Sequence, residues 1–241
     1  MATPRKICCK VTEITPYGQG VYSLKLVTER SIPQFQPGQF LHLAIDPYDP
    51  SSFWPDSRAF SIASSHSQPT LEIVYSVVGR FTKRMEQELA VGKEVWVKMP
   101  YGDFVIETTI EDSKGIVLIS GGTGVTAFIS FIRNLASQSS YPVHLVYGAR
   151  SSDLLIYAQE VSEVARKNKN FTFQLLAETA QDLSSNLTIG RIATEVFWSH
   201  LKDHDSLKYY LSGPPQMIKN LSEQLAQKGI DRSKIMIDAW D

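Results

Sequence analysis

The chain has 241 residues, enough for one large domain or for two domains of roughly 100–130 residues each. Its composition, 43% hydrophobic and 20% charged, is that of a globular protein and excludes a disordered chain. The net charge of −1 gives no overall basic field for nucleic acid, and no apolar run approaches the roughly 20 residues of a membrane-spanning helix.

The two cysteines, Cys8 and Cys9, are neighbours near the start of the chain. Adjacent cysteines rarely bridge each other, and two thiolates are too few for an iron–sulfur cluster. No apolar segment follows Lys6, so no secretory signal is predicted. We therefore expect both cysteines to lie in a strand of a cytoplasmic protein, in a reducing compartment.

The first part of the chain, residues 5–106, predicts β-structure. Short segments rich in β-branched and aromatic residues are expected to form six strands: Lys6–Thr12, Val21–Leu26, Gln39–Ile45, Arg58–Ile62, Leu71–Tyr75 and Glu94–Met99. Turn residues separate them, which favours a barrel or a sandwich. One helix is expected at Phe81–Leu89, with Thr82 as its N-cap. Its inward face would hold Met85, Leu89 and Ala90.

From about residue 113 strands and helices alternate. The expected strands are Ile116–Ser120, Val143–Tyr147, Phe171–Leu176, Tyr209–Leu211 and, as a candidate fifth, Lys234–Ile237. The expected helices are Val125–Ala136, Asp153–Lys167, Arg191–His200 and Pro215–Lys228, with Glu107–Lys114 as the linker before them. Alternation of this kind predicts a doubly wound α/β domain with a parallel sheet, which binds ligands beyond the carboxyl ends of its strands.

Four short motifs carry candidate chemistry: Gly121-Gly122-Thr123-Gly124, Ser212-Gly213-Pro214-Pro215, Arg58-Ala59-Phe60-Ser61 and Gly79-Arg80-Phe81-Thr82. Three of them sit where a strand gives way to a helix or where a helix starts, so that backbone N–H groups are available to a phosphate. Each also has a plain interpretation, as an ordinary helix start or cap. The third motif, an arginine and an aromatic residue on one strand face, is alone typical of a surface.

Other groups of residues are weaker candidates for a functional site. His200 and His204 are four residues apart, but no cysteine or third histidine stands nearby, so we predict no metal site. Ser61 and Ser212 lack a motif-level His–Asp partner, which argues against a hydrolytic triad. Three acidic residues of a proline-rich loop are expected to be solvated turn residues: Asp46, Asp49 and Asp56.

In this order the four motifs resemble those of the ferredoxin–NADP reductase superfamily. Three further segments match it: Pro37-Gly38-Gln39-Phe40, Tyr101-Gly102-Asp103-Phe104 and Tyr147-Gly148-Ala149-Arg150. The resemblance runs from about Lys6 to Trp240. It implies an antiparallel β-barrel domain that binds FAD in residues 1–110, followed by a doubly wound parallel-sheet domain that binds NAD(P) in residues 111–241.

The resemblance also implies roles for residues of the first domain. Arg58 would bind the flavin pyrophosphate, Phe60 would lie against the isoalloxazine, and Ser61 would donate a hydrogen bond towards flavin N5. The cofactor-binding set there is completed by Ala59, Tyr75, Ser76, Val77, Gly79, Phe81 and Thr82. FAD is favoured over FMN, because the helix start adds a second phosphate site beside Arg58.

In the second domain the resemblance gives the nicotinamide nucleotide a pyrophosphate site at Gly122, Thr123 and Gly124. Ser212, Gly213 and Pro214 would border the nicotinamide, and Trp240 would shield the flavin face. Ser61, Ser212 and Trp240 are thus the catalytic candidates. The chain departs from the pattern in three places, with Phe60 for the usual tyrosine, Ala127 for a common proline and Ser212 for a frequent cysteine.

The activity so implied is hydride transfer from NADH or NADPH to bound FAD, with electrons passed on to a separate acceptor protein that the sequence does not identify. Glu178 stands where a 2′-phosphate would bind, which favours NADH, while Arg150 and Arg191 are candidate phosphate partners on other loops. Two alternatives stay open: an NAD(P)H:flavin reductase with diffusible flavin, and a non-catalytic regulatory module. No metal, nucleic acid or membrane span is expected, and the oligomeric state is not indicated.

Overall fold

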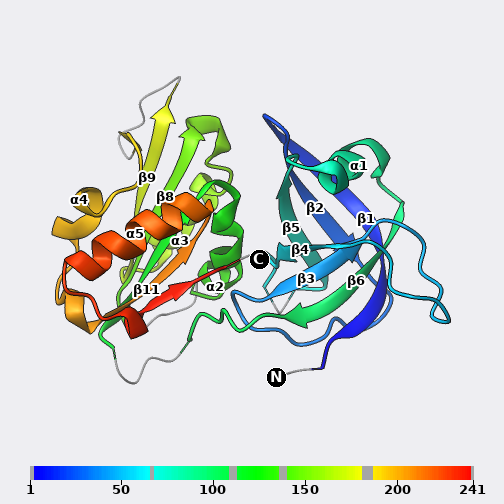
Figure 1. The fold of residues 1–241 in the computed structure, drawn as a ribbon, viewed down its shortest axis with the longest axis horizontal. Coiled ribbons are helices and arrows are strands. Elements are labelled where there is room, and N and C mark those ends of the chain that lie inside the picture. The colour runs from blue at the N-terminus through cyan, green and yellow to red at the C-terminus, as the bar shows by residue number, and fades with distance from the viewer. Residues whose placement is uncertain (1–2, 66–67, 109–112, 136–139, 181–186, 240–241) are drawn as a thin grey trace. The chain divides into compact units, whose positions relative to one another are not determined.

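The computed structural model describes residues 3–65, 68–108, 113–135, 140–180 and 187–239 (Figure 1). The chain divides into two compact units, Met1–Val105 and Ile106–Asp241. Among the described helices, none combines the length and the apolar character needed to cross a membrane.

The first unit is an antiparallel barrel with one helix. Its elements are β1 Arg5–Gly18, β2 Val21–Val27, β3 Phe40–Ala44, β4 Arg58–Ser61, β5 Thr70–Ser76, α1 Arg80–Glu88 and β6 Glu94–Tyr101. The strands are ordered β4-β3-β6-β1-β2-β5 and every pair is antiparallel. The two outermost strands, β4 and β5, lie in contact, so that the sheet nearly closes on itself. This confirms the predicted barrel.

Alternation along the strands explains why this sheet curls around a core. In β1 the side chains of Ile7, Cys9 and Val11 point inward and are buried, while Lys6 and Lys10 are exposed. The core also contains buried residues of the other strands, with Met85 of α1 packed against them. Because every second residue enters this apolar interior, the register of the strands is fixed.

Two details of α1 differ from the sequence prediction. The N-cap position is held by Gly79, and Thr82 lies in the first turn. The Thr82 hydroxyl still caps the start, because it accepts hydrogen bonds from the backbone N–H groups of Val78 and Gly79 at 3.0 and 3.1 Å. Ala90, expected to face inward, is exposed because the helix ends at Glu88.

The second unit is a parallel sheet covered by helices. Its strands are β7 Gly115–Gly121, β8 Val143–Ser151, β9 Phe171–Thr179, β10 Leu187–Ile189, β11 Leu207–Ser212 and β12 Ile235–Ile237, in the order β10-β9-β8-β7-β11-β12. Its helices are α2 Thr126–Leu135, α3 Ala158–Lys167, α4 Thr194–Phe197 and α5 Pro215–Gln227. The α4 and α5 helices pack on one face, and α2 and α3 lie on the other (Figure 1). This confirms the doubly wound fold.

Several predicted helices are shorter than expected. A 3₁₀ turn, Gly122–Val125, precedes α2, and another, Ser152–Leu154, precedes α3. The expected helix Arg191–His200 begins only at Thr194 and gives way to a 3₁₀ turn at Trp198. The β10 strand was not predicted, because it is only three residues long and largely exposed. Glu107, at the start of the predicted linker, is held by the second unit through Lys208 and the Tyr141 hydroxyl.

One buried histidine makes the stability of the second unit dependent on pH. Burial lowers the pKa of His144 in β8 to about 4, while its ring nitrogens lie within hydrogen-bond distance of Thr172 and Gln174. Between pH 6.5 and pH 4 the unfolded chain therefore binds a proton at this site that the folded chain does not, so stability falls as the pH falls.

We expect this histidine to remove about 1.5 kcal/mol from the free energy of unfolding between pH 6.5 and pH 5. Urea unfolding of the wild type and of His144→Leu at both values measures the contribution as the difference between the two pH dependences. If the free energy of unfolding depends on pH equally in the two proteins, the lowered pKa of His144 is contradicted.

Candidate functional site

The first unit brings together two motifs that lie about 20 residues apart in the sequence. Arg58, on β4, places its guanidinium 5.2 Å from the ring centre of Phe81 in the first turn of α1. Its Nη1 also donates to Asp56 Oδ1 at 2.6 Å and to the Ser57 carbonyl at 2.7 Å. The arginine side chain is 54% exposed. A cation thus stands beside the start of a helix, open to solvent, as an anionic phosphate group requires.

Aromatic side chains continue this site along β4 and β5. Phe60 meets the ring of Tyr75 edge to face at 6.4 Å, and Tyr75 stacks on Tyr22 at 5.3 Å. The Tyr22 hydroxyl donates to Glu86 on α1 at 2.8 Å. Burial raises the pKa of Tyr75 to about 12, so its phenol stays neutral at pH 7. Aromatic contacts therefore join strands β4, β5 and β2, and a hydrogen bond links the last of these rings to helix α1.

The start of α1 is shaped to accept an anion. The first backbone N–H groups of a helix have no acceptor within the helix, and here they follow Gly79. A side chain at Gly79 would meet no atom within 4 Å, so the space above this turn is open. The preceding residues, Ser76 and Val77, are held by strand pairing and by a hydrogen bond from the Val77 N–H to the Gly20 carbonyl.

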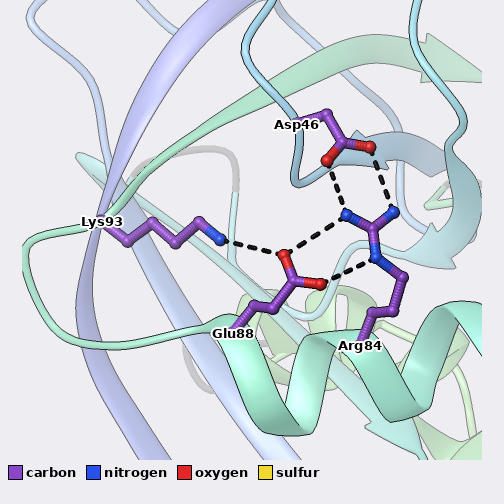
Figure 2. A network of polar contacts seen from close by, with 4 residues as sticks. All are labelled: Asp46, Arg84, Glu88 and Lys93. Carbon is purple, nitrogen blue, oxygen red and sulfur yellow. Dashed lines mark hydrogen bonds and ion pairs between the residues drawn. The ribbon is translucent and has the colours of Figure 1, made fainter.

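A polar network fixes α1 against the barrel (Figure 2). Arg84 donates to both carboxylate oxygens of Asp46, at 2.6 and 3.1 Å, and from its Nε to Glu88 at 2.8 Å. Lys93 Nζ lies 3.5 Å from Glu88. Hydrogen bonds from Arg84 lower the pKa of both carboxyl groups, so the network is fully charged at pH 7.

Two of the three loop aspartates form ion pairs that their predicted role as solvated turn residues does not include, although Asp56 is exposed as predicted. Asp46 holds Arg84 and Asp56 holds Arg58, in each case through a direct ion pair. Asp49 does bond within its own turn, to the N–H and hydroxyl of Ser51, as expected. The sequence prediction missed the first of these pairs because its partners are 38 residues apart.

In the second unit the two glycine-containing loops lie directly against each other. A side chain at Gly124 would come within 2.6 Å of both the Gly213 nitrogen and the Ser212 carbonyl oxygen, and one at Gly121 within 2.6 Å of the Met217 sulfur. Real Cβ atoms do not approach backbone so closely, so only glycine permits the contact. Gly122 is different, with a φ of +55° and open space around its Cβ position. The loop is thus packed on one side and accessible on the other.

Ser212 ends β11 with its hydroxyl buried. That hydroxyl donates to Asp238 Oδ2 at 2.8 Å, and the Asp238 N–H donates to the Leu211 carbonyl at 2.9 Å. Both side chains are almost inaccessible to solvent. Asp238 belongs to none of the sequence motifs described above. Its only signal was an acidic residue directly after the last predicted strand, at the edge where the carboxyl ends of the strands meet.

The carboxyl ends of β8 and β9 bring together the residues considered for nucleotide selectivity. Glu178 accepts from both Nε and Nη2 of Arg191 at 2.9 Å, and the Arg191 side chain is 82% exposed. The Thr179 hydroxyl donates to the Arg150 carbonyl at 3.1 Å, and Arg150 itself is exposed. Glu178, the acidic residue considered for nucleotide selectivity, is therefore paired with Arg191 from the neighbouring segment.

Of the remaining candidates, Thr123 accepts a hydrogen bond from the Thr126 hydroxyl at 2.7 Å, which tightens the turn before α2. Ala59 and Ser61 pair with His42 and Phe40 across β3. Trp240 lies outside the described residues. In the described part of the chain no group of three or more His, Cys, Asp or Glu is placed to hold a metal ion.

Comparison with known proteins agrees with the two-domain fold. Residues 118–223 match the family model of the oxidoreductase NAD-binding domain. The FAD/NAD-binding domain of a nitric oxide dioxygenase from Vibrio cholerae O1 biovar El Tor superposes over 100% of this chain and 99% of its own, with a TM-score of 0.82 and 20% identity. The chain has the fold of the ferredoxin–NADP reductase superfamily.

A ferredoxin NADP⁺ reductase from Neisseria gonorrhoeae, solved with bound FAD and NADP, shares this superfamily fold, with a TM-score of 0.79, 19% identity and 99% coverage of both chains. In sequence, the chain is 30% identical to the reductase component of a propane 2-monooxygenase from Rhodococcus jostii (strain RHA1), over 96% of its own length. It spans 62% of the length of that relative.

Proposed function

We propose that this protein is an NAD(P)H-dependent flavoprotein reductase, which takes a hydride from the nicotinamide into bound FAD and passes electrons to a separate protein. The observation that carries the proposal is the convergence of Arg58, Phe60 and the first turn of α1 in one unit. A guanidinium, a row of aromatic rings and open helix amides together suit a ligand that is both a diphosphate and a flat ring system.

The first unit fits FAD on its own geometry. Arg58 would hold the pyrophosphate with the amides after Gly79, where the absence of a Cβ contact leaves room. Phe60 would supply a flat face to the isoalloxazine, and Ser61 a hydroxyl donor. Bound FAD would supply the redox chemistry, as an acceptor of a hydride and a donor of electrons. The protein's part is to bind, orient and shield.

The second unit fits the nicotinamide nucleotide. The open side of Gly122 and the amides before α2 would hold its pyrophosphate, with Thr123 and Gly124. Ser212, Gly213 and Pro214 would border the nicotinamide ring. The buried bond from Ser212 to Asp238 would fix the serine hydroxyl in one direction, which orients the loop without any proton transfer.

The comparisons support this proposal. The family model is that of an NAD-binding oxidoreductase domain, a structural neighbour binds FAD and NADP, and the curated relative is the reductase component of an oxygenase. By analogy with that relative, the electron acceptor would be a separate protein. We also propose a cytoplasmic location, in keeping with two free thiols, Cys8 and Cys9, in β1.

The visible spectrum of the purified protein tests the proposal. We expect a yellow protein that retains flavin through gel filtration and bleaches when NADH is added under anaerobic conditions. Flavin that is lost on the column but reduced when resupplied would favour a reductase with diffusible flavin. Retained flavin that never bleaches with either nucleotide would favour the regulatory module and overturn the proposal.

The choice between NADH and NADPH is expected to depend on Glu178. Glu178→Arg should raise the ratio of kcat/KM for NADPH to that for NADH about tenfold or more, because it removes a carboxylate and frees Arg191 for a 2′-phosphate. Tenfold corresponds to about 1.4 kcal/mol, the value of one charge-assisted contact. Steady-state kinetics with both nucleotides measure the ratio.

Glu223→Arg is the matched control for this experiment, since it makes the same change of charge at an exposed position of α5. It should leave the ratio unchanged. A ratio that stays constant in Glu178→Arg, or that rises equally in the control, would reject the role of Glu178.

A further inference from the structure

The outer face of the barrel carries a row of basic residues across three strands. Lys6 of β1 pairs directly with Lys98 of β6, which pairs in turn with His42 of β3. Their neighbours in each strand, such as Ile7, Val97 and Leu43, point into the core, so the three side chains share the outward face. We call Lys6, Lys98 and His42 the cation row; burial and the charge of Lys98 lower the pKa of His42, so the positive charge of the row at pH 7 is that of the two lysines.

Within the described part of the chain, no carboxylate neutralises the two lysines of this row. Lysines directly opposite each other in a sheet repel and cost stability. Over the residues that the structure describes, neither Lys6 nor Lys98 forms an ion pair with a carboxylate. Glu94, an acidic residue of β6, is paired across the strands with Lys10, four residues along each strand from the pair of Lys6 and Lys98. The protein therefore maintains an unfavourable concentration of positive charge at one place.

Aromatic rings surround the row. Lys6 contacts the Tyr48 hydroxyl and lies 4.5 Å from its ring centre, and Lys98 lies 5.4 Å from that of Tyr101. Tyr48 meets Trp54 and Trp96 edge to face, each at 5.2 Å. Half-buried aromatic rings with a charged border are typical of the centre of a protein–protein interface.

The loop between β3 and β4 extends this surface with an exposed ring. Phe53 is 98% exposed, although its neighbour Trp54 is held by a hydrogen bond from Nε1 to the Ser57 hydroxyl at 2.9 Å. Asp49 also closes a tight turn in the same loop, through Ser51. Phe53 is thus presented to solvent between loop residues that are held by hydrogen bonds, which lowers the entropy cost of docking onto it.

The face also reaches the predicted flavin site. Phe40 of β3 pairs with Ser61 of β4 on one side and with Tyr101 of β6 on the other, in the row next to Lys98 and His42. Ser61 is the residue expected to bond flavin N5. A protein seated on the cation row would therefore lie beside the end of β4 that holds the flavin ring.

We propose that this outer face, formed by the cation row with Tyr48, Trp54, Trp96, Tyr101 and Phe53, is the docking surface for an electron-accepting protein that presents carboxylates around an apolar centre. The inference rests on the proposed reductase function and names the chemistry of its partner. Two lysines without an ion-pair partner among the described residues favour an acidic surface, and the exposed ring of Phe53 with the half-buried rings of Trp54, Trp96 and Tyr101 would supply the apolar contact.

Two haem proteins of opposite charge serve as probes, the acidic cytochrome b5 and the basic cytochrome c. One NADH supplies two electrons, and two cytochrome molecules take up one each. Lys6→Glu/Lys98→Glu is expected to slow cytochrome b5 reduction at low salt about tenfold or more, and to leave cytochrome c reduction equal or faster. The difference in the rate of cytochrome b5 reduction between this variant and the wild type should shrink in 0.5 M salt, where charges are screened over a few ångströms.

The matched control is Lys169→Glu/Lys202→Glu, which makes the same change of net charge at exposed lysines of the second unit. It should reduce cytochrome b5 almost as fast as the wild type. Phe53→Ser, at a side chain with no packing to lose, should weaken the reaction at low and high salt alike. If the cation-row variant and the control slow cytochrome b5 equally, or if neither does, the docking surface is wrong.

Two further measurements separate this proposal from that of the reductase function. Bleaching of the flavin by NADH, measured without any cytochrome, reports the reductase function alone. Binding of labelled cytochrome b5, followed by fluorescence anisotropy at low salt, needs neither flavin nor NADH. Weaker binding to the cation-row variant than to the control supports the surface even if no bleaching occurs, and equal binding overturns it. Lys98→Glu alone repeats the test without disturbing the contact of Lys6 with Tyr48.

Discussion

Gly124→Ala is expected to slow reduction of the flavin by NADH on the order of 100-fold while the flavin stays bound. The added Cβ would lie 2.6 Å from the Gly213 nitrogen and the Ser212 oxygen, both of them backbone atoms that cannot turn aside. The two loops must therefore separate, and a displacement near 1 Å of a group that positions a substrate costs about this factor. Anaerobic stopped-flow absorbance at saturating and limiting NADH measures the rate and the affinity.

Gly229→Ala provides the matched control. Gly229 follows α5 at a φ of +92° with open space around its Cβ position, so alanine there strains the backbone without meeting another loop. We expect this variant to be somewhat less stable than the wild type but to reduce its flavin at the normal rate. A Gly124→Ala protein that also reacts at the normal rate would show that the contact of the two loops has no part in nucleotide binding.

Arg58→Ala is expected to yield a colourless protein whose affinity for FAD is lower on the order of 100-fold. A charge-assisted hydrogen bond contributes about 1.5–3 kcal/mol, and every 1.4 kcal/mol is tenfold in affinity. The guanidinium would offer two such bonds to a pyrophosphate. The free energy that they contribute to binding is reduced by the loss of the hydrogen bond from Arg58 to Asp56. Quenching of flavin fluorescence during titration of the apoprotein measures the dissociation constant.

The comparison variant is Arg30→Ala, which removes an exposed arginine from the same unit, in the segment after β2. Its affinity for FAD should equal that of the wild type. Thermal unfolding of both apoproteins should also agree closely, because the Arg58 side chain is half exposed and its ion pair with Asp56 contributes little to stability. Undiminished binding of FAD by Arg58→Ala would exclude the pyrophosphate role.

The elements of the fold could be predicted because their signals are local. Alternation in β1, from Lys6 to Val11, gave the strand, and the apolar run of β7 followed by glycines gave the turn into α2. The N-cap of α1 was wrong by three residues, because Thr82 and Gly79 both satisfy the local pattern of a helix start and only the backbone path decides between them.

The parts of the site that could not be predicted depend on contacts between distant segments. Asp238 meets Ser212 across 26 residues, because β12 pairs with β11 and carries its last residues to the same edge of the sheet. Arg191 meets Glu178 because the chain after β10 passes the end of β9. No spacing in the sequence encodes such pairs, so a residue interpreted as a lone acid can be half of an ion pair.

Helix α1 is held at both ends before any ligand arrives. The Thr82 hydroxyl caps its start, Arg84 pairs with Asp46 of the barrel, and Glu88 at its end pairs with Lys93 (Figure 2). Its leading amides are consequently preorganised, and no folding step need accompany flavin uptake. Reconstitution of the apoprotein with FAD should then follow simple bimolecular kinetics, first order in FAD, without a slow unimolecular phase.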